Sequence, residues 1–384
     1  MQDNEKKPAL RFKGFTDPWE QRKLGDLCVE FRSGEFISAS DITETGEYPV
    51  FGGNGLRGFT DRFNHDGEYT LIGRQGALCG NVNFAVGKSY FTEHAIAVRA
   101  DKKNQTRFLY YLFSTMDLGQ YSGQSAQPGL AVGNLVELKS TLPDKQEQEK
   151  ISGVLTALDT LITLHQRKYE KLVNIKKSML DKMFPKNGAS VPEIRFKGFT
   201  DPWEQRKLGD ITVELSEYAT QELGLPLLTS SRSGLMYQDE YRDSRTTKST
   251  ETLFSVVPVG TCTYRHMSDD DVFHMNINTL EKGLVSREYP VFEASKGNNL
   301  EFLVQHINSS EEFKAFCAEQ KKGGTRTRLY YNTLCQFTVR VPALKEQAQI
   351  SQCLKKLDTL ITLHQRKLEK LQNIKKFCLE KMFV

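Results

Sequence analysis

Two stretches of the chain carry apolar residues at alternating steps of four and three, which is typical of a helix packed along one face. The first begins after Pro143 and ends near Met183, and the second begins after Pro342 and ends near Met382. A helix of ~40 residues is roughly 60 Å long. The two stripes consist of Ile151, Leu155, Leu158, Ile162, His165, Tyr169, Leu172, Ile175 and Met179, and of Ile350, Leu354, Leu357, Ile361, His364, Leu368, Leu371, Ile374, Cys378 and Met382.

The two stripes are near copies of each other. Leu158–Lys168 returns unchanged as Leu357–Lys367, so each helix offers the other the same apolar surface. This predicts an antiparallel coiled coil, and the alternative is that each helix docks on its own domain. His165 and His364 hold matching positions, and we interpret them as a polar pair that fixes the register, because two histidines do not complete a zinc site.

A second repeat frames the globular parts of the chain. Arg11–Asp26 returns unchanged as Arg195–Asp210, whereas the inserts Leu27–Leu142 and Ile211–Val341 are unlike each other. Identical frames with dissimilar inserts predict a scaffold with an internal pseudo-two-fold repeat that carries two different recognition modules. The predicted boundaries are a first domain at residues 1–142, a helix at 143–184, a second domain at 185–341 and a helix at 342–384.

The inserts are predicted to be mixed α/β, since short apolar runs alternate with Gly and Asn turns. Helices are expected at Thr106–Met116 and Glu311–Gln320. Strands are expected at Glu47–Phe51, Tyr69–Ile72, Asn81–Val86 and Ala95–Arg99, and at Leu225–Thr229, Leu253–Val257, Thr261–Arg265, Gly283–Ser286 and Phe337–Val341.

Charge is distributed unevenly along the 384 residues, whose net charge is +4. The first insert has 10 Lys and Arg against 12 Asp and Glu, and the second has 14 against 17. The rest of the chain therefore carries +9. Neither insert is the uniformly basic surface typical of indiscriminate nucleic-acid binding, so any DNA contact must come from local clusters.

The sequence favours a cytoplasmic, non-catalytic protein. Seven scattered cysteines without a CxxC pair indicate reduced thiols, and no apolar run is long enough to cross a membrane. Gly53–Gly58 fits GxGxxG, but no helix follows to bind a pyrophosphate. We interpret it as a turn that exposes Asn54 and Arg57, and we expect no cofactor, metal or catalytic residue.

Polar clusters suited to base edges fall where the inserts differ. Arg suits guanine, Asn and Gln suit adenine, and nearby Gly lets the backbone approach phosphate. The alternative for any one residue is an ordinary solvated loop. The candidates for DNA binding are Asn54, Arg57, Arg62, Arg74, Gln75, Gln124 and Gln127 in the first insert, and Arg232, Arg245, Lys248, Arg265, His266, Arg326 and Arg328 in the second.

Judged by these residues, the chain resembles the specificity subunit of type I restriction-modification systems over nearly its whole length. The strongest likeness lies in the frames Trp19–Asp26 and Trp203–Asp210. Both helix openings, Leu142–Ile151 and Val341–Ile350, match the Pro-x-x-x-Glu-Gln-x-x-Ile pattern of that family. Weaker likenesses lie in Ser125–Leu130, Gly283–Tyr289 and Gly324–Leu329, and the second insert lacks the Gln-Pro-Gly-Leu form of the first.

The resemblance implies two target recognition domains that each bind one half of a split DNA site, with the helices setting the spacer. It also implies docking of two methyltransferase subunits, which bind S-adenosylmethionine and methylate adenine, and of two restriction/translocase subunits. Two other hypotheses stay open: a single-chain DNA-binding regulator without enzyme partners, and a protein-interaction scaffold without salt-dependent DNA affinity.

Overall fold

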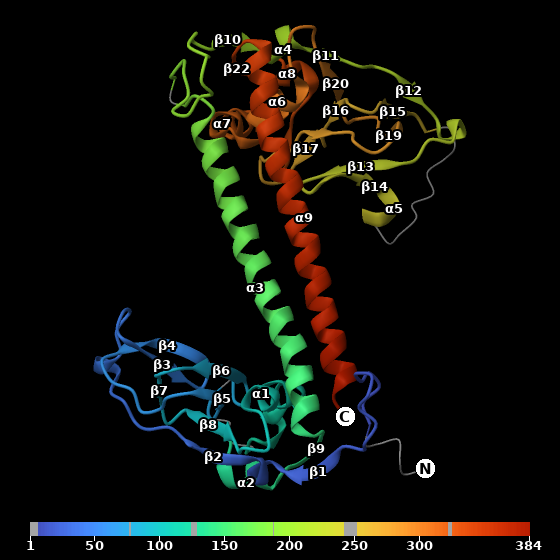
Figure 1. Ribbon diagram of the computed structural model, residues 1–384. Coiled ribbons are helices and arrows are strands. Elements are labelled where there is room, and N and C mark those ends of the chain that lie inside the picture. The colour runs from blue at the N-terminus through green and yellow to red at the C-terminus, as the bar shows by residue number, and fades with distance from the viewer. Residues whose placement is uncertain (1–6, 77, 124–128, 187, 242–251, 322–324) are drawn as a thin grey trace. The chain divides into compact units, whose positions relative to one another are not determined.

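The computed structural model describes residues 7–76, 78–123, 129–186, 188–241, 252–321 and 325–384, and it divides into two compact units (Figure 1). Unit 1 consists of Met1–Arg167 with His364–Val384, and unit 2 is Lys168–Leu363. Both long helices, α3 (Lys145–Lys182) and α9 (Leu344–Met382), cross this division. Each unit therefore contains the start of one long helix and the end of the other.

Besides its parts of the long helices, unit 1 contains nine strands and two short α-helices among its described residues. They are β1 (Glu20–Lys23), β2 (Cys28–Ser33), β3 (Tyr48–Gly52), β4 (Gly55–Thr60), β5 (Glu68–Gly73), β6 (Val82–Val86), β7 (Tyr90–Phe91), β8 (Ala95–Ala100), α1 (Thr106–Thr115), α2 (Val132–Glu137) and β9 (Lys139–Leu142). A four-stranded antiparallel sheet has the order β2-β8-β5-β6, and α1 packs on β5, β6 and β8 (Figure 1). A smaller sheet, β4-β3-β7, pairs β3 and β7 in parallel, and β1 pairs with β9.

Unit 2 divides its strands among more and smaller sheets. Its strands are β10 (Glu204–Lys207), β11 (Thr212–Glu214), β12 (Tyr218–Ala219), β13 (Leu228–Ser231), β14 (Gly234–Tyr237), β15 (Phe254–Val257), β16 (Cys262–Thr263), β17 (Met267–Ser268), β18 (Asn276–Ile277), β19 (Gly283–Ser286), β20 (Val291–Ala294), β21 (Thr327–Arg328) and β22 (Thr338–Val341). Its helices besides α3 and α9 are α4 (Leu208–Ile211), α5 (Gln238–Tyr241), α6 (Leu300–Ser309), α7 (Glu311–Glu319) and α8 (Tyr331–Leu334). The main sheets have the orders β11-β20-β16-β18 and β12-β15-β19, whereas β10-β22, β13-β14 and β17-β21 are two-stranded.

Each core combines its sheet with residues from both long helices. In unit 1, Ile151 of α3 and Met382 of α9 join a buried cluster that includes Trp19 and Phe108. In unit 2, Ile350 of α9 and Met183 after α3 join the cluster around Trp203 and Phe302. The buried apolar stripe of each helix is therefore shared between a recognition unit and the other helix.

The predicted mixed α/β class is confirmed, together with several of its elements. Thr106–Met116 and Glu311–Gln320 correspond to α1 and α7, and Gly283–Ser286 is β19. The strand predicted at Leu225–Thr229 is misplaced, because β13 begins at Leu228. Thr261–Arg265 was also predicted too long, because β16 ends at Thr263.

Within each unit the long helices run antiparallel. In unit 1, Asp159 of α3 contacts Lys375 of α9 at 2.6 Å, and His165 Nδ1 lies 2.8 Å from His364 Nδ1. In unit 2, Lys176 of α3 contacts Asp358 of α9 at 2.5 Å. The first and last of these contacts are copies of each other, so both units use the same pairing.

The predicted stripe residues are buried or half-buried, with two exceptions. Ile151, Leu155, Ile350 and Leu354 are fully buried, and Leu158, Ile162, His165, Leu172, Leu357, Ile361, His364 and Leu371 are half-buried or buried. Ile175 and Ile374, however, are each 38% exposed, so their assignment to the stripe was wrong. A straight helix drifts relative to a strict seven-residue repeat, which moves Lys176 and Lys375 into these positions beside Asp358 and Asp159.

Candidate nucleic-acid interface

The repeated frames are fastened to the long helices by two equivalent buried ion pairs. Arg11 Nε and Nη2 donate to both carboxylate oxygens of Glu147 at 2.7 Å, and Arg195 does the same to Glu346 at 2.7 and 2.8 Å. The glutamate side chains are 0% and 1% exposed. The hydrogen bond to the carboxylate raises the pKa of each arginine.

The glutamine that follows each glutamate joins the helix start to the recognition unit. Gln148 Nε2 donates to Pro143 O, and its Oε1 accepts from the backbone N–H of Gln105, directly before α1. Gln347 repeats this with Pro342 O and the backbone N–H of Asn299, directly before α6. The Glu-Gln motif thus has a physical basis, since Glu binds the frame and Gln binds the first insert helix against it.

Each frame also contacts the end of the other long helix. Leu10 N donates to Lys381 O at 2.7 Å in unit 1, and Ile194 N donates to Lys182 O at 2.9 Å in unit 2. The strand within each frame pairs with the strand leading into a long helix, as β1 does with β9 and β10 with β22. The frames therefore act as joints between recognition units and helices.

In unit 2, four predicted arginines gather near the turn between β13 and β14. Arg232 lies in that turn, Arg265 lies between β16 and β17, and Arg326 and Arg328 belong to the segment of β21, which pairs with β17. All four side chains are exposed. Segments separated by as many as 96 positions thus present one basic cluster, which we call the unit 2 cluster.

Three consecutive aspartates organise the basic side chains of unit 2. Asp269 contacts Arg326 at 2.6 Å, Asp270 contacts Arg232 at 2.5 Å, and Asp271 contacts Lys321 at 3.7 Å. Hydrogen bonds from Ser268 and then from Arg232 lower the pKa of Asp270. These carboxylates orient the basic side chains, which gives the cluster a defined geometry.

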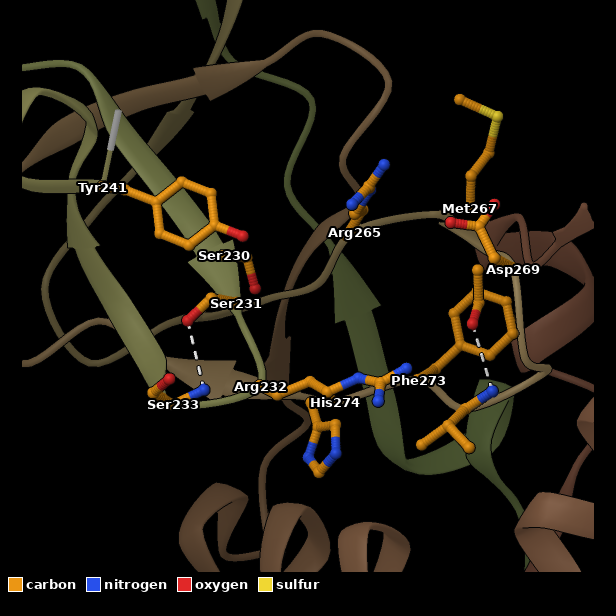
Figure 2. A pocket seen from close by; sticks show the side chains of 12 residues that line it. Ser230, Ser231, Arg232, Ser233, Tyr241, Arg265, Met267, Asp269, Phe273 and His274 are labelled. Carbon is orange, nitrogen blue, oxygen red and sulfur yellow. Dashed lines mark hydrogen bonds between the residues drawn. The ribbon is translucent and has the colours of Figure 1, made fainter. Parts of the chain in front are cut away.

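A cavity of about 240 Å³ opens beside the unit 2 cluster (Figure 2). Hydroxyl groups of Ser230, Ser231, Ser233 and Tyr241 line it together with Arg232 and Arg265. Burial and the nearby Arg232 lower the pKa of His274, which also lines the cavity. The positive charge of this site therefore comes from its arginines.

In unit 1, the candidate residues gather where three turns meet. The Gly53-Asn54 turn between β3 and β4 lies against Arg74 and Gln75 after β5 and against His94 before β8. A Cβ on Gly73 would lie 2.3 Å from Gly53 O, so only glycine permits this close approach. Gln75 Oε1 lies 3.0 Å from His94 Nδ1, and the backbone N–H of Arg74 donates to His94 O at 2.9 Å.

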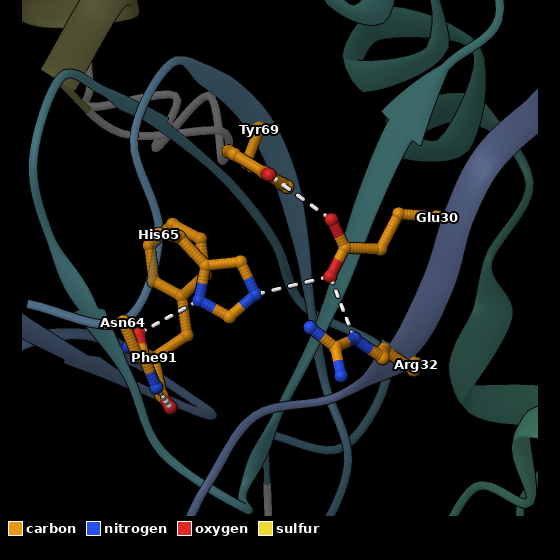
Figure 3. Close-up of polar contacts among 6 residues, drawn as sticks. All are labelled: Glu30, Arg32, Asn64, His65, Tyr69 and Phe91. Carbon is orange, nitrogen blue, oxygen red and sulfur yellow. Dashed lines mark hydrogen bonds and ion pairs between the residues drawn. The ribbon is translucent and has the colours of Figure 1, made fainter.

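A buried polar network lies between Phe91, three residues before His94, and strand β2 (Figure 3). Asn64 binds both backbone groups of Phe91, with its Oδ1 accepting from Phe91 N at 2.9 Å and its Nδ2 donating to Phe91 O at 3.0 Å. This fixes the amide orientation, so the 2.7 Å contact requires His65 Nδ1 to donate to Asn64 Oδ1. His65 Nε2 faces Glu30 at 3.2 Å, and burial lowers the pKa of His65 while Glu30 opposes that effect.

Glu30 completes the network by accepting hydrogen bonds from Arg32 and Tyr69. Burial opposes its ionisation, but hydrogen bonds from Arg32 and Tyr69 outweigh burial, and the pKa of Glu30 is lowered. His65 is 5% exposed and stacks on Phe91 with ring centroids 4.5 Å apart. We interpret the network as the support that holds the His94 turn in place.

The structure separates some predicted residues from these clusters. Asn54, Arg57, Arg74 and Gln75 lie in one region of unit 1, but Arg62 pairs with Asp41 at 3.0 Å and lies over the Tyr90 ring. His266 is buried and stacks on Tyr330, so it is not placed for a base contact. Gln124, Gln127, Arg245 and Lys248 fall outside the described residues. Sequence reasoning missed His94, for which the only signal was its place in a turn before a strand.

The described part of the chain also limits other chemistry. Its cysteines are all free thiols, and within it no group of three or more His, Cys, Asp or Glu side chains is arranged to hold a metal. Gly53 and Asn54 form a turn and Gly55–Gly58 belong to β4, so the backbone lacks the helix N-terminus of a dinucleotide site. None of the described helices has the length and apolar character needed to span a membrane.

Comparison with known proteins agrees with this architecture. The family described as type I restriction modification DNA specificity domain matches residues 16–174 and 274–373. The specificity subunit of the type I restriction enzyme EcoprrI from Escherichia coli is 44% identical over 156 residues, which cover 40% of this chain and 39% of that protein. The MjaIX specificity subunit of Methanocaldococcus jannaschii is 33% identical over 116 residues, or 28% of this chain and 27% of that one.

A solved structure supports the fold over the whole chain. The crystal structure of the type I restriction-modification S subunit from M. genitalium has a TM-score of 0.68 at 15% identity and covers 98% of this chain and 99% of that one. The family match extends over well over half of the sequence. The chain therefore belongs to the family of type I restriction-modification specificity subunits, whose role is DNA sequence recognition.

Proposed function

We propose that unit 1 and unit 2 each bind one half of a bipartite DNA site. The observation that carries this proposal is the duplicated attachment, in which Arg11–Glu147 and Arg195–Glu346 hold two dissimilar recognition units on equivalent joints. A single active site gives no reason for two copies of one joint. Two different surfaces on identical joints are suited to a target with two different halves.

The contacts to each half-site come from the two clusters. In unit 1 we assign Asn54, Arg57, Arg74 and Gln75, with His94 added from the structure. In unit 2 we assign Arg232, Arg265, Arg326 and Arg328. Arginine and amide side chains on closely approaching glycine turns suit base edges and phosphates, and their small number fits specific contact without a generally basic surface.

The long helices set the number of unread base pairs between the half-sites, since both α3 and α9 pass from one unit into the other. Their exposed apolar residues, such as Leu161 and Leu164 in unit 1 and Leu360 and Leu363 in unit 2, are suited to partner subunits. We assign these partners as two methyltransferase subunits, which bind S-adenosylmethionine and methylate adenine, and two restriction/translocase subunits. The chain itself contributes no catalysis, and it acts on genomic DNA in the cytoplasm.

The decisive test is methylation mapping of the genome of a clean host that expresses this chain with its cognate methyltransferase subunit. We expect a new split motif with methyladenine in both halves, absent when the methyltransferase subunit is expressed alone. A folded, co-purifying complex that produces no new methylation contradicts the proposal and favours the regulator or scaffold hypotheses.

Two altered chains extend the same experiment. Replacing Leu27–Leu142 with the insert of another family member should change one half-site and leave the other intact. Inserting four residues after Leu164 and four after Leu363 should lengthen the spacer and preserve both halves, because about one helical turn is added to each helix. A change in both halves in the first case, or an unchanged spacer in the second, contradicts the assigned roles.

A further inference from the structure

We propose that the cavity beside the β13–β14 turn of unit 2 binds one phosphate group of the DNA backbone, with Arg265 and Ser230 as its donors. This inference rests on the proposed function and divides the unit 2 cluster into two roles. The cavity positions the DNA, and base recognition is left to the other exposed arginines.

The first observation is a buried hydroxyl with a free hydrogen. Ser230 is 5% exposed, and its Oγ accepts a hydrogen bond from Asn276 Nδ2 at 2.7 Å. A serine hydroxyl can also donate one hydrogen bond, and no described residue accepts it. Ser230 lines the cavity (Figure 2), so a ligand there can accept this hydrogen bond. An unused donor in a buried position is costly unless a ligand or water satisfies it.

The second observation is an arginine whose charge is not neutralised by a described carboxylate. Arg232 and Arg326 are paired with Asp270 and Asp269, whereas no ion pair joins Arg265 to any carboxylate in the described structure. Arg265 lines the same cavity as Ser230. A cavity lined by an arginine without a carboxylate partner and by a serine hydroxyl is suited to a ligand that is negative and accepts hydrogen bonds.

The remaining lining favours phosphate over a base edge. Ser233 and Tyr241 add further hydroxyl groups, and the one carboxylate in the lining, that of Asp269, is already bound to Arg326. Base edges present donors as well as acceptors, whereas phosphate oxygens only accept. A cavity of about 240 Å³ is large enough for a phosphate together with its ester oxygens.

The test measures DNA affinity against salt for the complex of the full chain with its methyltransferase subunit, using cognate and scrambled duplexes. Loss of one phosphate contact lowers the slope of log K against log salt by about 0.9, which is roughly an eightfold loss at ~0.1 M. We expect R265Q to show this loss on both duplexes and to leave the methylated motif unchanged. R265K should keep the slope, and S230A should lose about fivefold in affinity with no change in slope.

The matched control is R206Q, which removes one exposed arginine of unit 2 on β10 and should leave the slope unchanged. Retained Trp203 fluorescence reports that each variant is folded. If R265Q binds both duplexes like the wild type, or if it alters the methylated motif, the phosphate assignment is wrong. Calorimetric titration of the wild-type complex with inorganic phosphate distinguishes free phosphate from the DNA backbone as the ligand. If inorganic phosphate binds but R265Q does not weaken DNA binding, the cavity is not a site for a DNA phosphate.

The same data distinguish this inference from the proposed function. A wild-type complex without a preferred sequence, in which R265Q still lowers the salt slope, overturns sequence-specific recognition and leaves the phosphate site standing. If the wild-type complex prefers its cognate sequence and R265Q binds DNA with the wild-type salt slope, sequence-specific recognition stands and the phosphate site is wrong.

Discussion

Unit 1 and unit 2 share their attachments and differ in nearly everything those attachments carry. Both use Arg-Glu pairs, Gln bridges and a frame contact to a helix end. Both units contain a four-stranded, a three-stranded and a two-stranded frame sheet, but their strand orders differ, and unit 2 adds the two-stranded sheets β13-β14 and β17-β21. A buried ion pair tolerates little change, because removal of one partner leaves a buried charge unpaired. The loops and sheets of the inserts are not restricted in this way, so the recognition surfaces can differ while the joints stay the same.

The comparison extends to single positions inside the cores. The Gln bridges align Gln105 with Asn299, which places Leu112 of α1 opposite His306 of α6. Both side chains are buried, but the ring of His306 stacks on Phe184 and its Nδ1 has no hydrogen-bond partner in the described structure. Unit 2 therefore has a titratable group where unit 1 has an apolar one.

The largest expected effect comes from breaking a joint. Glu147→Gln leaves Arg11 charged and unpaired in a buried site, which should cost about 3 kcal/mol of unfolding free energy. The chain has two tryptophans, Trp19 in unit 1 and Trp203 in unit 2, so fluorescence in a Trp203→Phe background reports unit 1 alone. Urea unfolding of the two chains in this background gives the difference.

The matched variant is Glu346→Gln, whose urea unfolding is monitored by Trp203 fluorescence in a Trp19→Phe background. We expect a similar loss confined to unit 2. Replacing both partners, as in Arg11→Met with Glu147→Leu, should recover much of the loss because no charge is left unpaired. If Glu147→Gln leaves unit 1 as stable as before, the joint does not depend on this ion pair.

The sequence predicted the long helices better than the recognition surfaces, for physical reasons. The long helices follow from local periodicity, and the Glu-Gln motif was visible as a repeat. Helix α6 was missed, and its start depends on the Asn299 cap and on the Gln347 bridge, a contact between residues 48 positions apart that local spacing cannot predict. The ion pairs that orient the unit 2 cluster join residues 38 and 57 positions apart, and local spacing cannot predict such pairs.

A second prediction uses the difference between Leu112 and His306. Burial lowers the pKa of His306 to about 4, below its ordinary value of 6.5. Between these values the unfolded chain binds more protons than the folded one, so unit 2 loses stability as the pH falls from about 6.5 toward 4. The full contribution is up to about 3 kcal/mol.

His306→Leu should remove this component of the pH dependence of unit 2, measured by urea unfolding at pH 7 and pH 5 with Trp203 as the probe. Leu112→His should introduce the same dependence in unit 1, with Trp19 as the probe. A pH dependence of unit 2 that is unchanged by His306→Leu would assign the effect to another group.

The smallest effect concerns the first residue before each long helix. Asp144 Oδ1 accepts from the backbone N–H of Glu147 at 2.9 Å and so caps α3, whereas α9 has Ala343 at this position. Asp144→Ala should therefore cost about 1 kcal/mol in unit 1.

In unit 2, however, the backbone N–H of Glu346 already donates to Ala343 O at 2.9 Å. This bond replaces part of the missing cap, so Ala343→Asp should stabilise unit 2 by less than Asp144→Ala destabilises unit 1. Equal and opposite changes in urea midpoint would show that the backbone bond contributes nothing, and that the two helix starts differ only in the side chain.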